Sequence, residues 1–339
     1  MLLLLSFLNT LIPPASDCYL RPDILDPHTN SDLKSISMDI AHSTHLSTHA
    51  SQEILSCISN NQYTQKRTTA APKVKSPFCQ FKKNLVDPYR IKKGAAFYQK
   101  HYTALKAAEE KYHVDPFIIT AIIGAESNYG SFTGSHLIKD ALATVIANTK
   151  TALTISTSGA SEEGVNFYQM NRKAFFINEL KALIELDLKK VIDISTVKGS
   201  WDGGIGLPQF MPTSYLQHAT SEQGAVPDLF NADDAIFSIA KYLIDRGNWN
   251  TGKVAIPYTP TTEEAAALKA QHSIQTNHHQ DARHIYRFTL NDDTSDYWLT
   301  YSNFDAIRTY NSRPHYVINI LLLSEAIHDN IRAAASSDI

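Results

Sequence analysis

The alternation of apolar and polar positions predicts a chain that is helical from about residue 81 onward. Between 254 and 296 the helical spacing is lost, and a short strand or hairpin fits that stretch better. Between 148 and 171 the residues are polar, which indicates a surface loop. Apolar residues recur three and four positions apart in segments 97–105, 115–130, 140–146, 175–188, 233–243 and 297–327. The fold class that this pattern predicts is predominantly α.

The helix predicted to begin at Pro116 has well-marked ends. Asp115 can accept hydrogen bonds from the first free backbone N–H groups, and Pro116 has no N–H to leave unsatisfied. Gly130 is a natural stop, because glycine readily adopts the left-handed conformation that closes many helices. The helix is therefore expected to start at a defined residue.

This helix also places one acidic side chain on its apolar face. Ile119, Ile122, Ile123 and Glu126 occupy positions i, i+3, i+4 and i+7, so the carboxyl group continues a stripe that faces the core. Apolar surroundings disfavour the charged form and raise the pKa of a carboxyl group, which allows it to act as a general acid near neutral pH. The alternative is that Glu126 lies at a frayed helix end and is solvated.

A second stretch, 199–215, holds four of the chain's 13 glycines. Gly203, Gly204 and Gly206 permit left-handed or closely approaching backbone, and Pro208 and Pro212 stiffen the residues that follow. We therefore expect a shaped loop. Its spacing does not match a phosphate-binding loop, so the alternative is an ordinary connector.

Charge excludes two classes of partner. The net charge of −3 and the pI near 6.5 give no general attraction to nucleic acid or to an anionic membrane surface. One run, 82–106, is locally basic, but its lysines alternate with apolar residues and indicate a solvated helix face.

The first 80 residues differ in character from the rest. Residues 1–16 begin with an apolar run of signal-peptide length, which predicts export, although the usual basic start and small-residue cleavage site are missing. Residues 17–80 are rich in Ser, Thr, His and Asn and predict a polar, disordered linker or tail. The globular domain is therefore expected at residues 81–332.

Three cysteines leave the redox state open. Cys18 suggests a lipid-modified N-terminus, but Asp17 is the wrong residue in front of it. Cys57 and Cys79 are candidates for a disulfide in an oxidising compartment, a question that the sequence alone does not decide.

Histidine-rich tracts invite a metal interpretation. His42, His45 and His49 lie close together, as do His278 and His279, but no cysteine or carboxylate ligand accompanies them at a known spacing. Polar tracts are the favoured interpretation, and neither a metal nor a cofactor is expected.

Five segments, in this order, resemble the lysozyme-like lytic murein transglycosylases of the membrane-bound B type. They are YHVDPFIITAIIGAESNYG, DALAT, GLPQFMPTSY, DDAIFSIAKYLIDRGNW and TYNSRPHY, and the resemblance covers roughly residues 85–328. It implies a goose-lysozyme-type α domain with an additional helical subdomain. It also implies a monomeric enzyme that acts on peptidoglycan glycan strands in the periplasm or cell envelope, with membrane attachment only through its N-terminus.

The resemblance also implies roles for individual residues. Glu126 matches the single catalytic acid and base, and Ser200 matches the serine that steadies it. Arg172 matches a basic residue that meets a carboxylate of the substrate. The other substrate-binding positions that it implies are Ser127, Asn128, Gln209, Phe210, Tyr242, Tyr310, Asn311 and Tyr316.

One carboxyl group is enough for a particular kind of glycosidic cleavage. Most glycosidases need two, but a substrate with an N-acetyl group can supply its own nucleophile. Glu126 would then protonate the glycosidic oxygen and later take a proton from the C6 hydroxyl of N-acetylmuramic acid, which closes a 1,6-anhydro ring without water.

The chain departs from the family pattern at Asp202, where alanine is usual. If Asp202 faced the cleft it would activate water and give a lysozyme-like hydrolase, and if it is a turn residue it would not. A catalytically silent peptidoglycan-binding or envelope-assembly protein is the second alternative. The acidic, calcium-type loop of some relatives is missing between Tyr215 and Asp233, which also predicts no metal.

Overall fold

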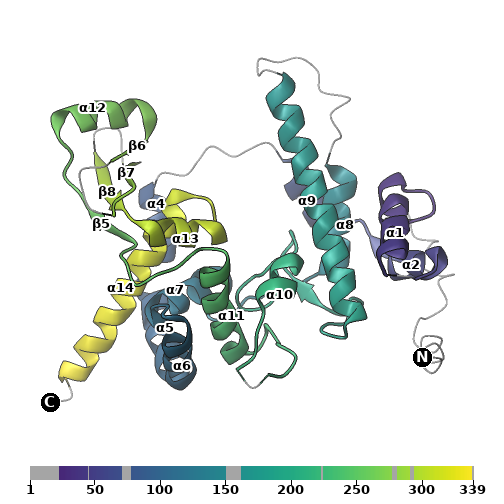
Figure 1. Cartoon of the computed structure of the whole chain (residues 1–339), viewed down its shortest axis with the longest axis horizontal. Helices are drawn as coiled ribbons and strands as arrows, with labels where there is room; N and C mark the ends of the chain where they lie inside the picture. Colours follow the sequence, from purple (N-terminus) through teal and green to yellow (C-terminus); the bar gives the residue numbers. More distant parts are fainter. Residues whose placement is uncertain are drawn as a thin grey trace. The chain divides into compact units, whose positions relative to one another are not determined.

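The computed structural model describes residues 23–44, 46–70, 78–149, 162–222, 224–276, 281–290 and 294–337. These residues form fourteen helices and eight short strands (Figure 1), so the predominantly α class is confirmed. The chain divides into two compact units. Unit 1 comprises residues 1–71, 134–204 and 211–213, and unit 2 comprises residues 72–133, 205–210 and 214–339.

Unit 1 is built from two separate stretches of sequence. Its elements are β1 (Ile24–Leu25), α1 (Ser31–Thr44), α2 (Thr48–Ile54), β2 (Ile58–Ser59), α3 (Gln62–Thr69), β3 (His136–Leu137), α8 (Ile138–Asn148), α9 (Glu162–Leu188) and β4 (Lys198–Gly199). α8 packs against α9 and α3, and α1 packs against α2. The strands pair antiparallel, β1 with β2 and β3 with β4.

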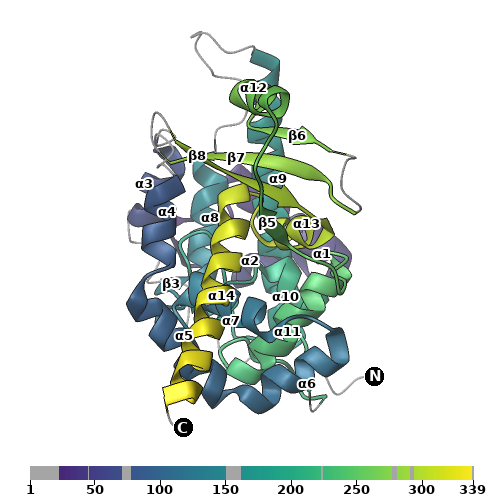
Figure 2. The same cartoon turned by 90° about the vertical axis from the view of Figure 1, so that its left-hand side faces the viewer.

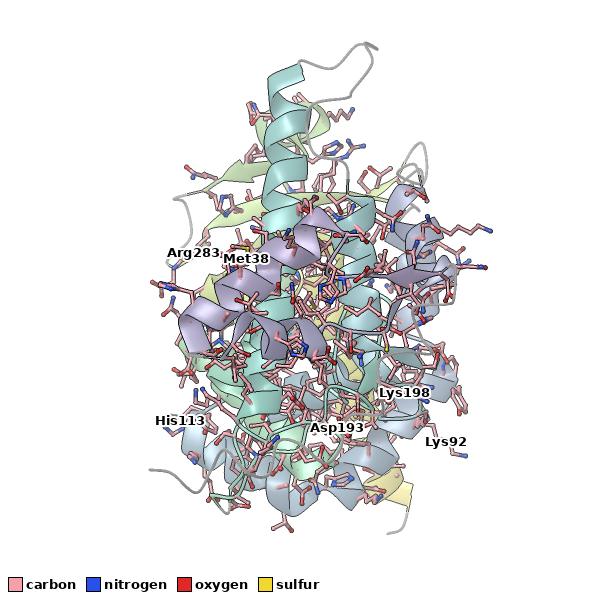
Figure 3. All side chains as sticks on the ribbon, turned by 90° about the vertical axis from the view of Figure 1, so that its right-hand side faces the viewer. Met38, Lys92, His113, Asp193, Lys198 and Arg283 are labelled. Carbon is pink, nitrogen blue, oxygen red and sulfur yellow. The ribbon has the colours of Figure 1, made fainter. Side chains whose placement is uncertain are left out.

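The prediction of a disordered tract at 17–80 is wrong for its described part. Leu33, Ile36 and Ile40 are buried on one side of α1, while Met38 on the other side is 56% exposed and points outward (Figure 3). Asn61 N–H donates to Thr144 Oγ1 of α8 at 2.9 Å. The stretch is therefore a folded part of unit 1, and the expected domain start at residue 81 is wrong.

Unit 2 contains the helix predicted around Glu126. Its helices are α4 (Phe78–Leu85), α5 (Pro88–Lys100), α6 (Tyr102–Tyr112), α7 (Pro116–Ser127), α11 (Ala232–Asp245), α12 (Thr262–Gln271), α13 (Ser302–Tyr310) and α14 (Pro314–Ser337), and α10 (Pro212–His218) starts in unit 1 and continues here. α7 packs against α5, α6, α11 and α14 (Figure 2), which buries it on most sides.

A small sheet occupies the stretch for which a strand or hairpin was expected. It consists of β5 (Ala255–Pro257), β6 (Ser273–Gln275), β7 (His284–Thr289) and β8 (Ser295–Thr300), in the antiparallel order β5-β8-β7-β6. Leu268, Ile285 and Leu299 form its buried core. Residues 297–300 were expected to start a helical run, but they form the second part of β8 instead.

Several predictions fall outside the described residues: the signal segment, Cys18, His45, His278 and His279, and residues 150–161 of the loop expected at 148–171. Residues 162–171 of that loop are described and form the first part of α9. The candidate pairing of Cys57 with Cys79 is wrong, because Cys57 takes part in a disulfide while Cys79 is a free thiol. Within the described ranges no helix is long and apolar enough to cross a membrane.

Candidate active site

The local sequence of α7 accounts for the position of Glu126. Asp115 caps the helix by accepting a hydrogen bond from Phe117 N–H at 2.7 Å. Ile119, Ile122 and Ile123 are fully buried, as their spacing predicts. Glu126 follows them in the last turn and is half-buried, so its carboxyl group lies where the core meets the surface.

The helix ends at Ser127, three residues before the predicted Gly130 stop. Asn128 adopts the left-handed conformation (φ 50°) and its N–H donates to Ile123 C=O. Ser127 is fully buried, and its hydroxyl donates to Ile123 C=O at 3.2 Å and accepts from Gly130 N–H at 3.0 Å. Both side chains stand at a helix end, and the bonds of Ser127 favour a structural role over substrate contact.

Tyr316 in the first turn of α14 bonds directly to the carboxyl group of Glu126. Its hydroxyl donates to Glu126 Oε1 at 2.7 Å. Burial, and then the negative charge of Glu126, hold the pKa of Tyr316 well above its usual value of 10.0. Tyr316 therefore remains a hydrogen-bond donor to this carboxylate throughout the neutral range.

Three further aromatic residues of the predicted set form one cluster. Ring centroids lie 5.1 Å apart for Tyr242 and Tyr310, 5.3 Å for Phe210 and Tyr242, and 5.9 Å for Phe210 and Tyr310. Phe210 and Tyr242 are 3% and 5% exposed, whereas Tyr310 is half-buried. The buried rings of Phe210 and Tyr242 therefore support the more exposed ring of Tyr310.

The tyrosine hydroxyls of this cluster bond to backbone. Tyr242 Oη donates to Thr309 C=O at 2.7 Å, and Tyr310 Oη donates to Pro208 C=O. Burial raises the pKa of Tyr310 well above 10.0, and the next cause is the charge of Glu126, so the two groups interact electrostatically.

Gln209 is held in an unusual conformation at the end of the glycine-rich loop. Its φ is 51°, in the left-handed region that non-glycine residues seldom adopt. Its Nε2 donates to Thr133 C=O at 3.1 Å and to Gly206 C=O at 2.7 Å. Among the described residues nothing donates to its Oε1, which leaves that atom available to an amide N–H of a ligand.

Asn311 ends α13 and starts the predicted bend. Its Oδ1 accepts a hydrogen bond from Arg313 N–H at 3.2 Å, so part of its side chain serves the turn. The bend at 311–313 separates α13 from α14, as the sequence predicts.

Three of the predicted or discussed residues lie in unit 1. Ser200 Oγ donates to Asp202 Oδ1 at 2.7 Å and accepts from Gly204 N–H at 2.7 Å, which closes a tight turn. The Arg172 guanidinium carbon lies 5.8 Å from the centre of the Phe176 ring. The expected contacts of Ser200 with Glu126 and of Arg172 with substrate stay predictions.

Two cations at the end of α7 were missed by the sequence analysis. Arg90 Nη1 donates to Gly124 C=O, and Lys93 Nζ donates to Asn128 C=O at 2.8 Å, so both satisfy carbonyls that the helix end leaves free. Positive charge there also interacts favourably with the negative end of the helix dipole. Both residues lie in the basic run that the sequence indicated as a solvated face, and only the packing of α5 on α7 reveals their use.

Ligands for a metal are not gathered in the part of the chain that the structure describes. No group of three or more His, Cys, Asp or Glu side chains there could hold an ion.

Comparisons with known proteins identify relatives of this chain. The family model of the transglycosylase SLT domain matches residues 28–325. Membrane-bound lytic murein transglycosylase B of Escherichia coli is 28% identical over 264 residues, which is 73% of this chain and 66% of that protein. The chain thus spans about two thirds of the length of this relative.

Solved structures show the same fold. The Escherichia coli lytic transglycosylase Slt35 in complex with bulgecin A superposes with a TM-score of 0.74, 25% identity and coverage of 90% of this chain and 95% of that one. SltB3 from Pseudomonas aeruginosa in complex with NAG-anhNAM-pentapeptide gives 0.70, 20% identity, and 87% and 78% coverage. The family match, which covers most of the sequence, shows that this chain belongs to the transglycosylase SLT domain family.

Proposed function

We propose that this chain is a peptidoglycan lytic transglycosylase that cleaves the β-1,4 bond between N-acetylmuramic acid and N-acetylglucosamine. The observation that carries the proposal is the hydrogen bond from Tyr316 to Glu126, at the end of a buried helix in a chain of this family. The curated relative bears the name of a lytic murein transglycosylase.

Glu126 acts twice in the proposed reaction. As an acid it protonates the glycosidic oxygen while the carbonyl oxygen of the substrate's N-acetyl group attacks the anomeric carbon. As a carboxylate it then takes the proton of the C6 hydroxyl, whose oxygen displaces the acetamido oxygen and closes the 1,6-anhydro ring. The Tyr316 hydroxyl stabilises the carboxylate between these two steps, because it donates to Oε1.

The cleft residues bind the sugars. The half-buried Tyr310 offers an aromatic face supported by Phe210 and Tyr242. Gln209 Oε1 accepts from an acetamido N–H of the glycan. For Ser200 and Arg172 we propose the roles that the resemblance implies.

The turn formed by Ser200 favours the transglycosylase over the hydrolase. Asp202 Oδ1 already accepts from Ser200 Oγ at 2.7 Å, as expected of a turn residue rather than of a base that activates water. We infer that Asp202 shapes the loop and that the reaction needs no second carboxylate.

The same relatives support a proposal for where the enzyme works. We propose that the chain is exported to the periplasm or cell envelope and works there as a monomer on glycan strands, without metal or cofactor. The name of the Escherichia coli relative describes a membrane-bound enzyme. For this chain, any membrane attachment would depend on its N-terminus.

Digestion of purified peptidoglycan sacculi tests the proposal against both alternatives. We expect soluble muropeptides that carry 1,6-anhydromuramic acid, detected by mass spectrometry, from the wild type and from Asp202→Asn alike. Reducing-end muropeptides alone, lost in Asp202→Asn, would establish the hydrolase. Binding to sacculi without any product, unchanged in Glu126→Gln, would establish the silent binding protein.

A further inference from the structure

Two aromatic rings stand exposed at the same place on unit 2. Phe132 is 70% exposed and Tyr89 is 69% exposed, more than any other large apolar or aromatic side chain described. The ammonium group of Lys93 lies 5.9 Å from the centre of the Tyr89 ring and also donates to Ser131 Oγ, next to Phe132. We name Tyr89, Lys93, Ser131 and Phe132 the Lys93 patch.

The patch is held by hydrogen bonds rather than by apolar packing. Phe132 N–H donates to Ser127 C=O at 2.9 Å, and Lys93 Nζ donates to Asn128 C=O at 2.8 Å. These bonds fix the 128–132 turn, so the Phe132 ring is presented to solvent by a constrained backbone. Large aromatic side chains that are exposed together commonly mark binding surfaces.

The patch is continuous with the candidate active site along the chain. On one side of Phe132, its backbone is bonded to Ser127, the residue after Glu126. On the other side, Thr133 C=O accepts from Gln209 Nε2 at 3.1 Å. Phe132 therefore lies between a residue adjacent to the proposed acid and the residue held by the proposed sugar-binding glutamine.

We propose that the Lys93 patch is an accessory glycan-binding subsite, in which a sugar ring of the strand stacks on Phe132. The C–H face of a pyranose ring is apolar and matches an exposed aromatic face. The Lys93 ammonium has three donors, two of which are used by Asn128 and Ser131, and the third fits a carboxylate of the substrate. This inference rests on the proposed function and assigns part of its substrate specificity to residues outside the acid–base centre.

Binding without turnover isolates the contribution of the patch. In a Glu126→Gln background, the affinity for purified sacculi is measured by co-sedimentation for Phe132→Ala, Phe132→Trp and Tyr102→Ala. Tyr102 is the matched control, because it is an aromatic residue of unit 2 that is 52% exposed on α6. We expect Phe132→Ala to bind about tenfold more weakly, as loss of an aromatic contact predicts, and the other two to bind normally.

Kinetics of the active enzyme distinguish this inference from the proposed function. In the Glu126-containing chain, Phe132→Ala should raise KM on long glycan strands with little change in kcat, since the patch binds but does not touch the reacting bond. If the wild type cleaves sacculi and Phe132→Ala binds as tightly as Tyr102→Ala, the subsite is refuted while the proposed function stands. If the wild type neither binds nor cleaves, the proposed function fails and this inference fails with it.

Discussion

A neighbouring hydroxyl bonds directly to the carboxyl group of Glu126. Tyr316 is the third residue of α14 and donates to Glu126 Oε1 at 2.7 Å, from a position 190 residues further along the chain. A donor to a carboxylate favours the charged form, which is the form that must accept the C6 proton in the proposed second step. The contact between α14 and α7 therefore stabilises the form of Glu126 that accepts this proton.

Tyr316→Phe tests this link at the scale of one atom. The variant keeps the ring and removes only the hydroxyl, so we expect kcat on sacculi to fall by about ten- to a hundredfold with KM nearly unchanged. The pH–rate profile should move to higher pH, because the carboxylate loses a stabilising donor. An unchanged kcat and profile would show that Tyr316 only packs against Glu126.

Tyr129 carries a buried hydroxyl that the structure leaves without a partner among the described residues. Its ring fills the space beside Gly94 and Gly124, where an added Cβ would lie 2.5 Å from it. Burial raises the pKa of Tyr129 far above 10.0 in the folded chain. An unsatisfied buried hydroxyl costs about 1–3 kcal/mol, so the position is one where stability can be gained.

Tyr129→Phe is expected to raise the free energy of unfolding by about 1 kcal/mol at neutral pH, because it keeps the ring and removes the unpaired group. The advantage should grow above about pH 10, where the unfolded tyrosine ionises and the folded one does not, which destabilises the wild type. Urea unfolding at neutral pH and above about pH 10 measures the difference in stability, with Tyr89→Phe, at an exposed tyrosine, as control. A loss of stability at neutral pH would reveal a partner for the hydroxyl, such as a bound water.

At the residue scale the sequence was informative only where a residue broke a pattern. Glu126 stood out because a carboxyl group continued an apolar stripe. Arg90 and Lys93 did not stand out, because lysine and arginine on a helix surface are ordinary and their carbonyl partners lie on another helix. Contacts between helices that are distant in sequence have no local signature.

Among the elements, the glycine-rich loop is shaped by backbone contacts that a side chain would block. Gly206 has a φ of +71°, and a Cβ there would lie 2.3 Å from Leu229 C=O. Leu207 N–H also donates to that carbonyl at 2.8 Å. This contact holds the residues that lead to Gln209.

Gly206→Ala should therefore lower the free energy of unfolding by more than 2 kcal/mol, about 1 from the left-handed backbone and the rest from the clash. Activity on sacculi should fall with it, since Gln209 and Phe210 follow. Gly224→Ala is the control, because it has a similar φ of +69° but nothing within 4 Å, and only the backbone cost applies. Equal effects of the two substitutions in thermal unfolding would refute the contact with Leu229.

The elements that the sequence predicted best have clear apolar stripes, and two of them, α7 and α11, also have capping side chains. α7, α8 and α11 lie within two residues of their expected bounds at most ends, and Asp115 and Asn231 cap their helices as short polar side chains do. The β-sheet was predicted only as a strand or hairpin, because its strands have three to six residues and lie between polar loops. The pairing of short strands that polar loops separate depends on the fold around them.

For the whole molecule, the largest error of the sequence analysis was the expected domain boundary. Unit 1 combines the start of the chain with residues 134–204, and Asn61 bonds to Thr144 across 83 positions. Leu33, Ile36 and Ile40 follow a helical stripe, but Ser, Asp and His around them lower the mean hydropathy of α1. The family resemblance, in contrast, was confirmed, since the model of the transglycosylase SLT domain matches residues 28–325.

Leu33→Ala distinguishes a folded N-terminal stretch from a linker. Leu33 is fully buried in unit 1, so the substitution should lower the free energy of unfolding by about 2–4 kcal/mol. Met38→Ala on the exposed side of α1 should change it by less than about 0.5 kcal/mol. If denaturant unfolding gives the same free energy of unfolding for the two variants, this stretch is a linker and not part of the folded unit.

The central claim is that Glu126 alone performs the acid–base chemistry and that water takes no part. Digestion of sacculi in water enriched in the heavy oxygen isotope, followed by mass spectrometry of the muropeptides, tests it most directly. We predict anhydromuramoyl products without heavy oxygen from the wild type and no products from Glu126→Gln. Incorporation of one heavy oxygen atom at the anomeric carbon of the muramic acid would contradict the claim.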